Sequence, residues 1–475
     1  MIPFNQTKII CTVGPASESI EVMQGLVLAG MDVIRMNFSH GDHAQHKRMI
    51  DTITKINENL GTNVATLLDT KGPEIRTHSF KDGKVTIKEG TVVTIHMEEV
   101  VGDEQSFSTT YENLYKDLTV GNTVLVDDGY LELTVTKIAN KKVFAKAENT
   151  HVVKNRRGIN LPGVKTSLDF VSKKDYEDIV FGCENDVDFI AASFVRRASD
   201  VQEIKNILKY GGNKNIQIIS KIENKEGVDN IDEIIEISDG VMIARGDLGV
   251  EVPAEEVPVI QKEIINKCLA AGKISVTATQ MLESMIDHPR PTRAEVSDVA
   301  NAIYDGTDAI MLSGESAIGM YPIESVETMN RIAHRIEKQI DRKDIVKRAN
   351  KESVAFRKIE TSIAISVAYT VIQAEVDLII VPTVSGKTAK YLSKYRPDAK
   401  ILALTSSAKN ARGLQLHSCV EPIEFPLSTD TESVVKEAIA IAKKDHGIKK
   451  GDRVIITGGF PIGAPTNGMR IIDIK

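Results

Sequence analysis

Residues 218–249 of the chain read IISKIENKEGVDNIDEIIEISDGVMIARGDLG. This stretch has the pattern of a strand, a helix and a second strand, with Lys221 and Glu223 ending the first strand and Asp247 ending the second. Side chains along a strand alternate between two faces, so Lys221 and Glu223 point to the same side, and a parallel neighbour brings Asp247 to the same rim. Two carboxylates there suit a hard divalent ion such as Mg²⁺, and the lysine suits charge developing on an oxygen or a phosphoryl group.

Similar strand patterns recur along the chain outside residues 73–170. Eight apolar runs with polar endings are predicted as strands: KIICTVGP (8–15), VIRMNFSH (33–40), NVATLLDT (63–70), DFIAASFV (188–195), IQIISKIE (216–223), GVMIARGD (240–247), ISVTATQ (274–280) and AIMLSGES (309–316). Amphipathic helical stretches separate them, which is typical of parallel strands buried on both faces. A count of eight favours a closed (β/α)8 TIM barrel over an open sheet.

The polar strand endings would meet at the C-terminal rim of this barrel, where barrel enzymes place their chemistry. A lone Lys-x-Glu pair is more often a weak surface salt bridge than a functional site. A barrel shaped by stability alone, however, has little reason to gather so much polarity at one end. The predicted rim contains Arg35, Asn37, Ser39, Asp69, Thr70, Lys221, Glu223, Asp247, Thr279, Ser313 and Glu315.

Residues 73–170 interrupt the barrel pattern after its third strand. The runs KVTIKEG, TVVTIHMEE, NTVLVDDGYLELTVTKI and KVFAKAE alternate polar and apolar residues, with turn signals at Asp82-Gly83 and Asp128-Gly129. We therefore expect a small all-β barrel that leaves and re-enters at the rim and acts as a lid. The sequence Arg156-Arg157-Gly158 at its exit suits an anionic ligand, although a solvated basic turn is an equally good interpretation.

Residues 1–72 and 171–345 are thus predicted to form the barrel, and residues 346–475 a C-terminal three-layer α/β domain. A long amphipathic helix from Pro322 to about Lys347 and a polar stretch, DRKDIVKRANKESVAFRK, are expected to join the two. In the C-terminal domain the strand VDLIIVPT runs into a loop and a helix. The loop carries hydroxyls, a glycine and a lysine, which suit a phosphate group. Its residues are Thr383, Ser385, Gly386, Lys387 and Thr388. It lacks Walker A spacing, and helix capping by Ser385 is the alternative interpretation.

The composition is that of an ordinary soluble enzyme, with 475 residues, 42% hydrophobic residues and a formal net charge of -7. This charge argues against a nucleic-acid partner and against general membrane adhesion. The sequence contains no apolar run of the roughly 20 residues that span a bilayer, and no signal peptide is visible. The four cysteines are isolated, so we expect reduced thiols in a cytoplasmic protein.

Several long motifs in the chain resemble those of the pyruvate kinase family. They are MDVIRMNFSHG (31–41), LLDTKGPEIRT (67–77), GINLPG (158–163), ISKIEN (219–224), ARGDLGVE (244–251), TATQMLESM (277–285) and PRPTRAEVSDVANAIYDGTDAIMLSGESAIG (289–319). The resemblance extends from Lys8 to Ile472. The chain length is similar to that of the shorter bacterial, fructose-bisphosphate-activated type without an extra C-terminal phosphohistidine domain.

This resemblance implies transfer of a phosphoryl group from phosphoenolpyruvate to ADP, which gives pyruvate and ATP. Glu223 and Asp247 would hold Mg²⁺ (or Mn²⁺), and Lys221 would neutralise charge on the phosphoryl group and on the enolate. The implied catalytic residues are Lys221, Arg35, Thr279 and Arg76. The implied phosphoenolpyruvate-binding residues are Arg35, Lys221, Gly246, Asp247 and Thr279. For the proton donor to enolpyruvate, the family-like candidate is Thr279, with Ser313 and Glu315 arranging water.

Two further sites follow from the resemblance. Potassium would be bound by Asn37, Ser39, Asp69 and Thr70, and Glu74 is the residue that accompanies potassium dependence in this family. The nucleotide would be bound by Asn37, Phe38, Ser39, His40, Arg76 and Arg157. The family usually has lysine at the position of Arg157. Arginine keeps the charge but offers a broader, planar set of hydrogen-bond donors, which affects the expected nucleotide affinity.

The C-terminal loop resembles the one that grips a phosphate of a sugar-phosphate activator, and Thr466 and Asn467 lie where such a site is closed. Fructose 1,6-bisphosphate is the first choice, with AMP or a sugar monophosphate as alternatives. Family members are usually homotetramers, and helices within residues 244–271 and 325–340 are candidate contact surfaces. Two other functions remain open: another magnesium-enolate barrel enzyme acting on pyruvate, such as an aldolase or carboxylase, and a catalytically silent metabolite sensor.

Overall fold

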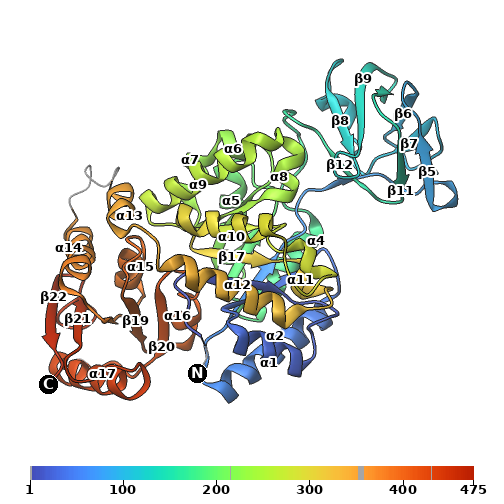
Figure 1. Ribbon diagram of the computed structural model, residues 1–475. Coiled ribbons are helices and arrows are strands. Elements are labelled where there is room, and N and C mark those ends of the chain that lie inside the picture. The colour runs from blue at the N-terminus through green and yellow to red at the C-terminus, as the bar shows by residue number, and fades with distance from the viewer. Residues whose placement is uncertain (1–2, 214, 351–357, 429) are drawn as a thin grey trace.

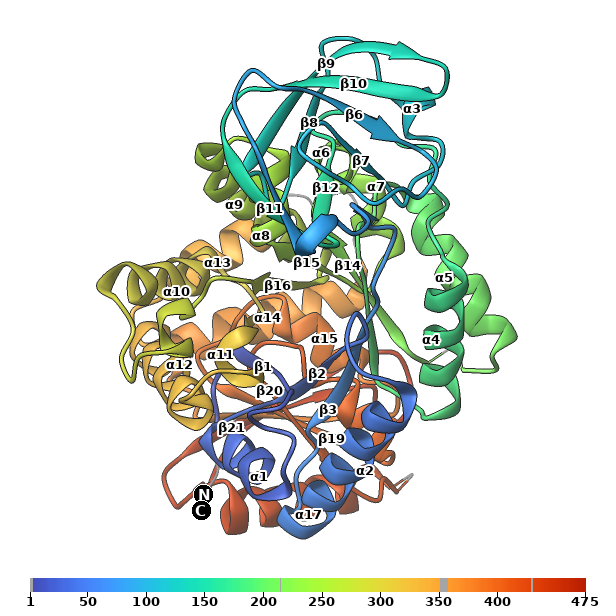
Figure 2. The same cartoon turned by 90° about the vertical axis from the view of Figure 1, so that its right-hand side faces the viewer.

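A computed structural model describes residues 3–213, 215–350, 358–428 and 430–475. Three domains lie in a row, with the barrel in the middle, the inserted β domain at one end and the C-terminal α/β domain at the other (Figure 1). Figure 2 shows the inserted domain covering one end of the barrel. The predicted fold class is therefore confirmed.

The eight predicted barrel strands all form, and they close into a parallel barrel in the order β1-β17-β16-β15-β14-β13-β3-β2. Their inward side chains pack into a layer of buried aliphatic and aromatic residues. The strands are β1 (Lys8–Thr12), β2 (Val33–Asn37), β3 (Ala65–Asp69), β13 (Phe189–Ala192), β14 (Gln217–Ile222), β15 (Gly240–Ala244), β16 (Ile274–Ala278) and β17 (Ala309–Leu312).

Helices cover the outside of the barrel, and several carry the capping signals that their sequences predict. Ser172 and Asp175 form a capping box at the start of α4, and Gly272 ends α9 in the left-handed conformation that glycine tolerates. The helices are α1 (Ile20–Ala29), α2 (His43–Leu60), α4 (Lys173–Glu184), α5 (Ala198–Tyr210), α6 (Lys225–Asp229), α7 (Ile231–Ile237), α8 (Arg245–Glu251), α9 (Val257–Ala271), α10 (Arg293–Asp305), α11 (Gly314–Ala317) and α12 (Pro322–Glu337).

The insertion is a mixed β domain whose seven-stranded sheet has the order β4-β12-β8-β9-β10-β6-β7, beside a two-stranded sheet of β5 and β11. Asp82 and Asp128 both adopt positive φ at the predicted turns, each followed by a glycine that does the same. The strands are β4 (Ile75–Arg76), β5 (Lys84–Ile87), β6 (Val92–His96), β7 (Ser106–Ser108), β8 (Thr123–Val126), β9 (Leu131–Ala139), β10 (Lys142–Ala147), β11 (His151–Lys154) and β12 (Gly158–Asn160), with α3 (Leu114–Asp117).

The single helix predicted from Pro322 to about Lys347 is wrong. Helix α12 ends at Glu337, and α13 (Arg342–Ala349) begins anew because the Asp341 side chain accepts from the amides of Lys343 and Asp344. Ile345, Val346 and Ala349 pack into the core of the C-terminal domain. Residues 351–357 of the predicted linking stretch lie outside the described residues.

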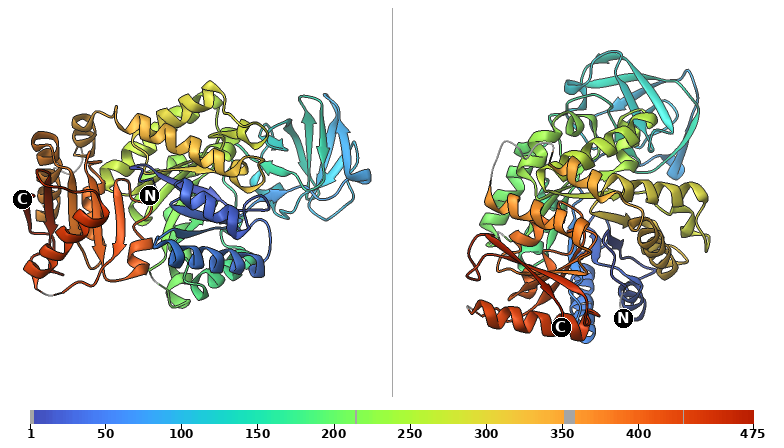
Figure 3. Two further views of the ribbon diagram at one scale, coloured as in Figure 1. Left: turned by 60° about the horizontal axis from the view of Figure 1, so that its bottom comes forward. Right: turned by 60° about the vertical axis from the view of Figure 1, so that its left-hand side comes forward.

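The C-terminal domain is an α/β sheet in the order β20-β19-β18-β21-β22, and the two views in Figure 3 show helices on both of its faces. Strands β20 and β22 were not predicted. The elements are α14 (Ile359–Ala374), β18 (Leu378–Pro382), α15 (Lys387–Ser393), β19 (Lys400–Thr405), α16 (Ala408–Arg412), β20 (Val420–Glu424), α17 (Thr431–Asp445), β21 (Arg453–Gly458) and β22 (Gly468–Asp473).

The C-terminal domain closes the end of the barrel opposite the polar rim. Leu416 is fully buried and belongs to the same hydrophobic cluster as the inward barrel side chains. Around it, Arg396 pairs with Asp308 at 2.7 Å and Arg412 with Asp188 at 3.1 Å. Among the described residues, no helix is long and apolar enough to cross a membrane.

Candidate active site

Lys221 is the centre of a buried polar network at the barrel rim. Its Nζ lies 3.1 Å from Asp69 Oδ1, 3.0 Å from Glu223 Oε1 and 2.7 Å from Ser193 Oγ. Burial opposes the charged form of Lys221, but Asp69 and Glu223 outweigh it and raise the pKa of the amine. The structure therefore holds a charged ammonium inside the barrel mouth.

Arg35 lies beside this network and is fixed from two sides. Its Nε donates to Asp69 Oδ2 at 2.6 Å, and one terminal nitrogen donates to Thr12 Oγ1 at 2.8 Å. Burial raises the pKa of Asp69, but Arg35 and Lys221 more than offset this effect and leave the pKa below its ordinary value. Arg35 and Lys221 thus share the buried carboxylate of Asp69 at the rim.

Glu223 and Asp247 come together as predicted. Burial raises the pKa of Glu223 to about 7 against the opposing effect of Lys221, and Asp247 adds to the increase. Burial also raises the pKa of Asp247. Because Asp247 disfavours ionisation of Glu223, a cation between the two carboxylates would relieve this effect. No set of three or more His, Cys, Asp or Glu side chains in the described part of the chain could hold a metal, but two carboxylates fit Mg²⁺, which keeps several positions for water and substrate oxygens.

Thr279 is held in an unusual backbone conformation next to this carboxylate pair. It has φ of 69°, a left-handed value that is strained for a β-branched residue. Its hydroxyl accepts from the amide of Gly246 at 2.8 Å, so this N–H is engaged by Thr279 in the structure. Gly246 and Asp247 both lie in the first turn of α8, where backbone amides and the helix dipole favour an anion.

The four residues predicted to bind potassium are neighbours at the ends of β2 and β3. Asn37 and Asp69 face each other in the parallel register, and the Asn37 side-chain oxygen accepts from the Ser39 amide at 3.1 Å. The Thr70 hydroxyl accepts from the Ser193 amide at 3.1 Å. Uncharged oxygens plus one carboxylate fit a large monovalent cation, because their total charge is low.

Phe38 does not offer its side chain to a nucleotide. Its ring is buried and stacks on His46 with centroids 3.9 Å apart, because strand alternation turns it away from Asn37 and Ser39. The Phe38 amide donates to the Asp69 carbonyl at 3.0 Å, and the Phe38 carbonyl accepts a hydrogen bond from Lys174 at 2.8 Å. His40 is exposed and close in sequence, and its carbonyl accepts from His46 at 3.0 Å.

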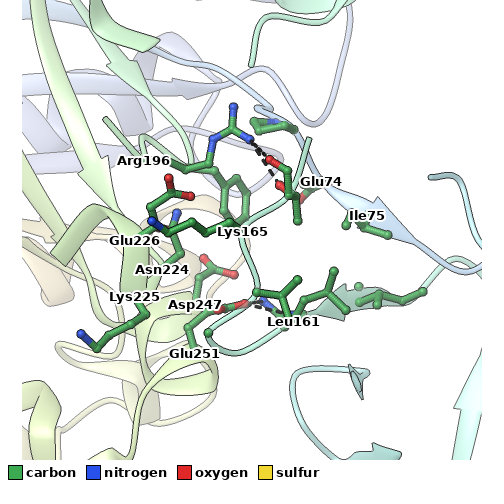
Figure 4. A pocket seen from close by; sticks show the side chains of 18 of the residues that line it. Glu74, Ile75, Leu161, Lys165, Arg196, Asn224, Lys225, Glu226, Asp247 and Glu251 are labelled. Atoms are coloured by element: carbon green, nitrogen blue, oxygen red, sulfur yellow. Dashed lines mark hydrogen bonds between the residues drawn. The ribbon is translucent and has the colours of Figure 1, made fainter. Parts of the chain in front are cut away.

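A cavity of about 330 Å³ separates the inserted domain from the barrel rim, and Asp247, Arg76 and Arg157 line it. Figure 4 shows Asp247 and Glu251 on one side and Glu74 on the other. The Arg76 guanidinium donates to both oxygens of Glu74, at 2.8 and 3.0 Å. Arg157 Nε lies 3.4 Å from Asp127 Oδ1, so both arginines are held by acids next to the cavity.

Glu315 is structural in this conformation. It is completely buried, and its two carboxylate oxygens accept from the amides of Leu282 at 3.0 Å and Ser313 at 2.7 Å. These bonds fix the turn after β17. Because both carboxylate oxygens are occupied by backbone amides, Glu315 is poorly placed for its expected role of arranging water.

Sequence reasoning missed two residues of the site. Ser193 Oγ contacts Lys221 and also lies 3.1 Å from Asp69 Oδ1, so it joins the two charges. Glu251 accepts hydrogen bonds from Asn160 and Leu161 of the inserted domain. Ser193 is a polar residue two positions before the end of the predicted strand DFIAASFV (188–195), and this polar position was the available signal. The role of Glu251 depends on a domain contact that no local pattern predicts.

The predicted phosphate loop forms at the C-terminal end of β18. Thr383 Oγ1 accepts from the Gly386 amide at 3.0 Å, and Gly386 adopts φ of 75°. Ser385 does not cap α15, whose N-cap is Gly386 without a side-chain bond. Thr388 Oγ1 lies 2.7 Å from Thr466 Oγ1, so the loop and the segment expected to close it are in contact, while Lys387 is exposed.

Comparison with known proteins agrees with this geometry. Residues 4–326 match the model of the pyruvate kinase barrel domain, and residues 361–472 match that of the pyruvate kinase alpha/beta domain. Pyruvate kinases of Staphylococcus saprophyticus and Geobacillus stearothermophilus are each 50% identical over 470 residues, which cover 98% of this chain and 80% of the relative. A crystal structure of a pyruvate kinase from Cryptosporidium parvum superposes with a TM-score of 0.95 at 40% identity, covering 99% of this chain and 96% of the other. The chain belongs to the pyruvate kinase family.

Proposed function

We propose that the protein transfers the phosphoryl group of phosphoenolpyruvate to ADP, which yields pyruvate and ATP in the last step of glycolysis. The observation that carries this proposal is the buried, charged Lys221, 3.0 Å from Glu223 and 3.1 Å from Asp69 at the barrel rim. An ammonium fixed beside Glu223, one of the two carboxylates that suit a divalent ion, is suited to a reaction in which anionic oxygens gain charge.

Arg35 and Lys221 would orient the phosphoryl group and balance its charge during a loose, metaphosphate-like transition state. Lys221 would also stabilise the enolate that remains. Both cations are already held by Asp69 at 2.6 and 3.1 Å, so little reorganisation is needed when charge develops. Glu223 and Asp247 would hold Mg²⁺ or Mn²⁺, which would supply Lewis-acid stabilisation of substrate oxygens.

The substrate carboxylate would bind at the first turn of α8, beside Gly246 and Asp247. Because the Gly246 amide donates to Thr279 at 2.8 Å, a bound carboxylate would compete for that donor and shift the Thr279 hydroxyl toward substrate. Thr279 is the family-like candidate for the residue that delivers or relays the proton to enolpyruvate.

ADP would bind against the Asn37–His40 loop, and Arg76 and Arg157, which line the cavity under the inserted domain, would reach its phosphates. Potassium would be bound by Asn37, Ser39, Asp69 and Thr70, and its positive charge would balance Glu74. Closure of the inserted domain would exclude water and strengthen the electrostatic interactions.

The C-terminal domain would bind a phosphorylated sugar, with fructose 1,6-bisphosphate as first choice. The support is the Thr383–Thr388 loop and its 2.7 Å contact with Thr466. The proposal extends to a cytoplasmic homotetramer. A subunit contact at β22 is supported by its place at the edge of its sheet, where Ile471 is 50% exposed. Val259 on α9 is 60% exposed and supports a second contact.

The test is a lactate-dehydrogenase-coupled assay with phosphoenolpyruvate, ADP, Mg²⁺ and K⁺. Lys221→Ala should lower turnover roughly 10²-fold or more, as for loss of one well-placed electrostatic stabiliser. Lys262→Ala is the matched control, because Lys262 is exposed and pairs with Asp305 at 3.0 Å away from the rim. A wild-type protein that binds sugar phosphates but is inactive would instead support the metabolite sensor.

A further inference from the structure

Glu251, the last residue of α8, joins the barrel to the inserted domain. Its Oε1 accepts from the side-chain amide of Asn160 at 3.2 Å and from the backbone amide of Leu161 at 3.3 Å. Both donors lie where the inserted domain returns to the barrel, since Asn160 is the last residue of β12 and Leu161 follows it. Figure 4 shows this contact at the edge of the cavity.

The same short helix carries the substrate end of the site. Gly246 and Asp247 occupy its first turn, and Asp247 and Glu251 are four residues apart, which places them on one face of the helix. Both line the cavity between the domains. Helix α8 therefore connects the residues expected to bind phosphoenolpyruvate and metal with the segment that positions the lid.

A second contact supports this connection. A Cβ built on Gly129 would lie 3.5 Å from Val250 Cγ1, so the turn that contains Asp128 and Gly129 packs against the C-terminal end of α8. The turn follows β8, which pairs with β12. Two different parts of the inserted domain thus rest on Val250 and Glu251.

We propose that Glu251 is a positioning residue for phosphoryl transfer, which fixes the inserted domain over the cavity by accepting from Asn160 and Leu161. This inference rests on the proposed function. The bonded segment begins three residues after Arg157, the arginine expected to reach the nucleotide phosphates. A loss of the Glu251 contact should therefore loosen the nucleotide side of the site and leave the phosphoenolpyruvate side, built on the rigid barrel rim, largely unchanged.

Variants at Glu251 separate hydrogen-bond acceptance from charge and from general stability. Glu251→Gln keeps the accepting oxygen and should behave like wild type. Glu251→Ala removes it and should raise the KM for ADP about 5- to 30-fold, the change expected for one or two lost hydrogen bonds to a charged acceptor. The KM for phosphoenolpyruvate should change less than twofold. Glu255→Ala is the control, because Glu255 is exposed just beyond α8.

Hydrogen–deuterium exchange of the ligand-free protein gives a readout that does not require activity. The peptide that covers residues 156–166 should exchange about tenfold faster in Glu251→Ala than in wild type, Glu251→Gln or Glu255→Ala, because the Leu161 amide loses its acceptor. Unchanged exchange in Glu251→Ala would overturn the proposal, as would equal increases in both KM values or a Glu251→Gln variant as impaired as Glu251→Ala. If the wild type lacks activity, the exchange experiment still shows whether Glu251 holds residues 156–166 in place.

Discussion

The guanidinium of Arg245 donates a hydrogen bond of 2.7 Å to the carbonyl oxygen of Thr279. Arg245 is itself held by Asp298, with Nη1 2.7 Å from Oδ1 and Nη2 2.7 Å from Oδ2. Thr279 has φ of 69°, a conformation that persists only where surrounding contacts impose it. The pair Asp298–Arg245 therefore holds the Thr279 hydroxyl next to Gly246.

We predict that Arg245→Lys lowers kcat/KM about 10²-fold, the scale of a 1 Å misplacement at a reacting centre. Lysine keeps the charge but cannot bond the Thr279 carbonyl and both Asp298 oxygens at once. Steady-state kinetics measure the loss, and circular dichroism checks that the fold is retained. Arg293→Lys, at an exposed position in the first turn of α10, should match wild type. Full activity in Arg245→Lys would contradict the role given to this pair.

Ser193 contributes through its hydroxyl, which bridges Lys221 at 2.7 Å and Asp69 at 3.1 Å. Ser193→Ala should lower turnover roughly 2- to 10-fold, since one hydrogen bond contributes about 0.5–1.5 kcal/mol. The change should appear in kcat, because the alanine keeps the cavity and the substrate contacts. Ser366→Ala on α14 is the control. A turnover equal to wild type would show that Asp69 and Glu223 alone orient Lys221.

Patterns local to the sequence predicted the barrel and the charged part of the site. The eight strands were predicted because buried parallel strands are apolar runs with polar ends. Lys221 and Glu223 lie at the end of β14, whereas Asp247, predicted to end the next strand, lies in the first turn of α8. Strand β20 was missed because its VEPIE sequence contains a proline and two acids, which is unusual for a strand. Phe38 was predicted to bind the nucleotide, but its side chain continues the period-two alternation of Ile34 and Met36 into the core.

Other features depended on contacts distant in the sequence and could not be predicted from it. Glu251 meets Asn160 and Leu161 only after the inserted domain folds back onto α8. The packing of Ile345 and Val346 into the C-terminal domain also depends on distant contacts, whereas the Asp341 cap that begins α13 is a local signal. The contacts made by these residues are therefore set by tertiary packing and not by local helix propensity.

Binding of a divalent ion should depend on pH through Glu223, whose pKa is raised to about 7 by burial against the effect of Lys221. Metal requires the carboxylate, so the affinity for Mn²⁺ should rise about tenfold per pH unit below 7 and level off above it. Isothermal titration calorimetry at pH 6, 7 and 8, in two buffers of different ionisation enthalpy, would measure the affinity and the proton released. An equal affinity at pH 6 and pH 8 would contradict the assignment.

The stability of the metal-free protein should change in the opposite direction. Because the folded-state pKa of Glu223 lies above its ordinary value of 4.5, the folded state binds more protons and is progressively destabilised as pH rises from about 4.5 to 7. Glu223→Gln removes this titration, so its unfolding midpoint should vary less with pH over that range. Urea titrations of the two metal-free proteins across this window test the sign.

Leu416 fills the end of the barrel opposite the rim although it belongs to the C-terminal domain. Leu416→Ala should lower the free energy of unfolding by about 2–5 kcal/mol, because it leaves a cavity among closely packed side chains. Denaturant unfolding followed by far-ultraviolet circular dichroism measures this change. Leu28→Ala, on the exposed side of α1 at 49% exposure, should cost far less. A similar small cost for both variants would show that the two domains do not share a core at Leu416.

Glu74 should make activity depend on a monovalent cation. Its carboxylate accepts from Arg76 at 2.8 and 3.0 Å and lies 3.8 Å from Lys71. Wild type should lose most of its turnover when choline replaces potassium. Glu74→Lys places an ammonium at the rim and should retain turnover in choline, whereas Glu74→Gln removes the charge without adding a cation and should still require potassium. Coupled assays of the three proteins in potassium and in choline measure this ratio. If wild type is equally active in both salts, the oxygens of Asn37, Ser39, Asp69 and Thr70 do not bind an essential cation.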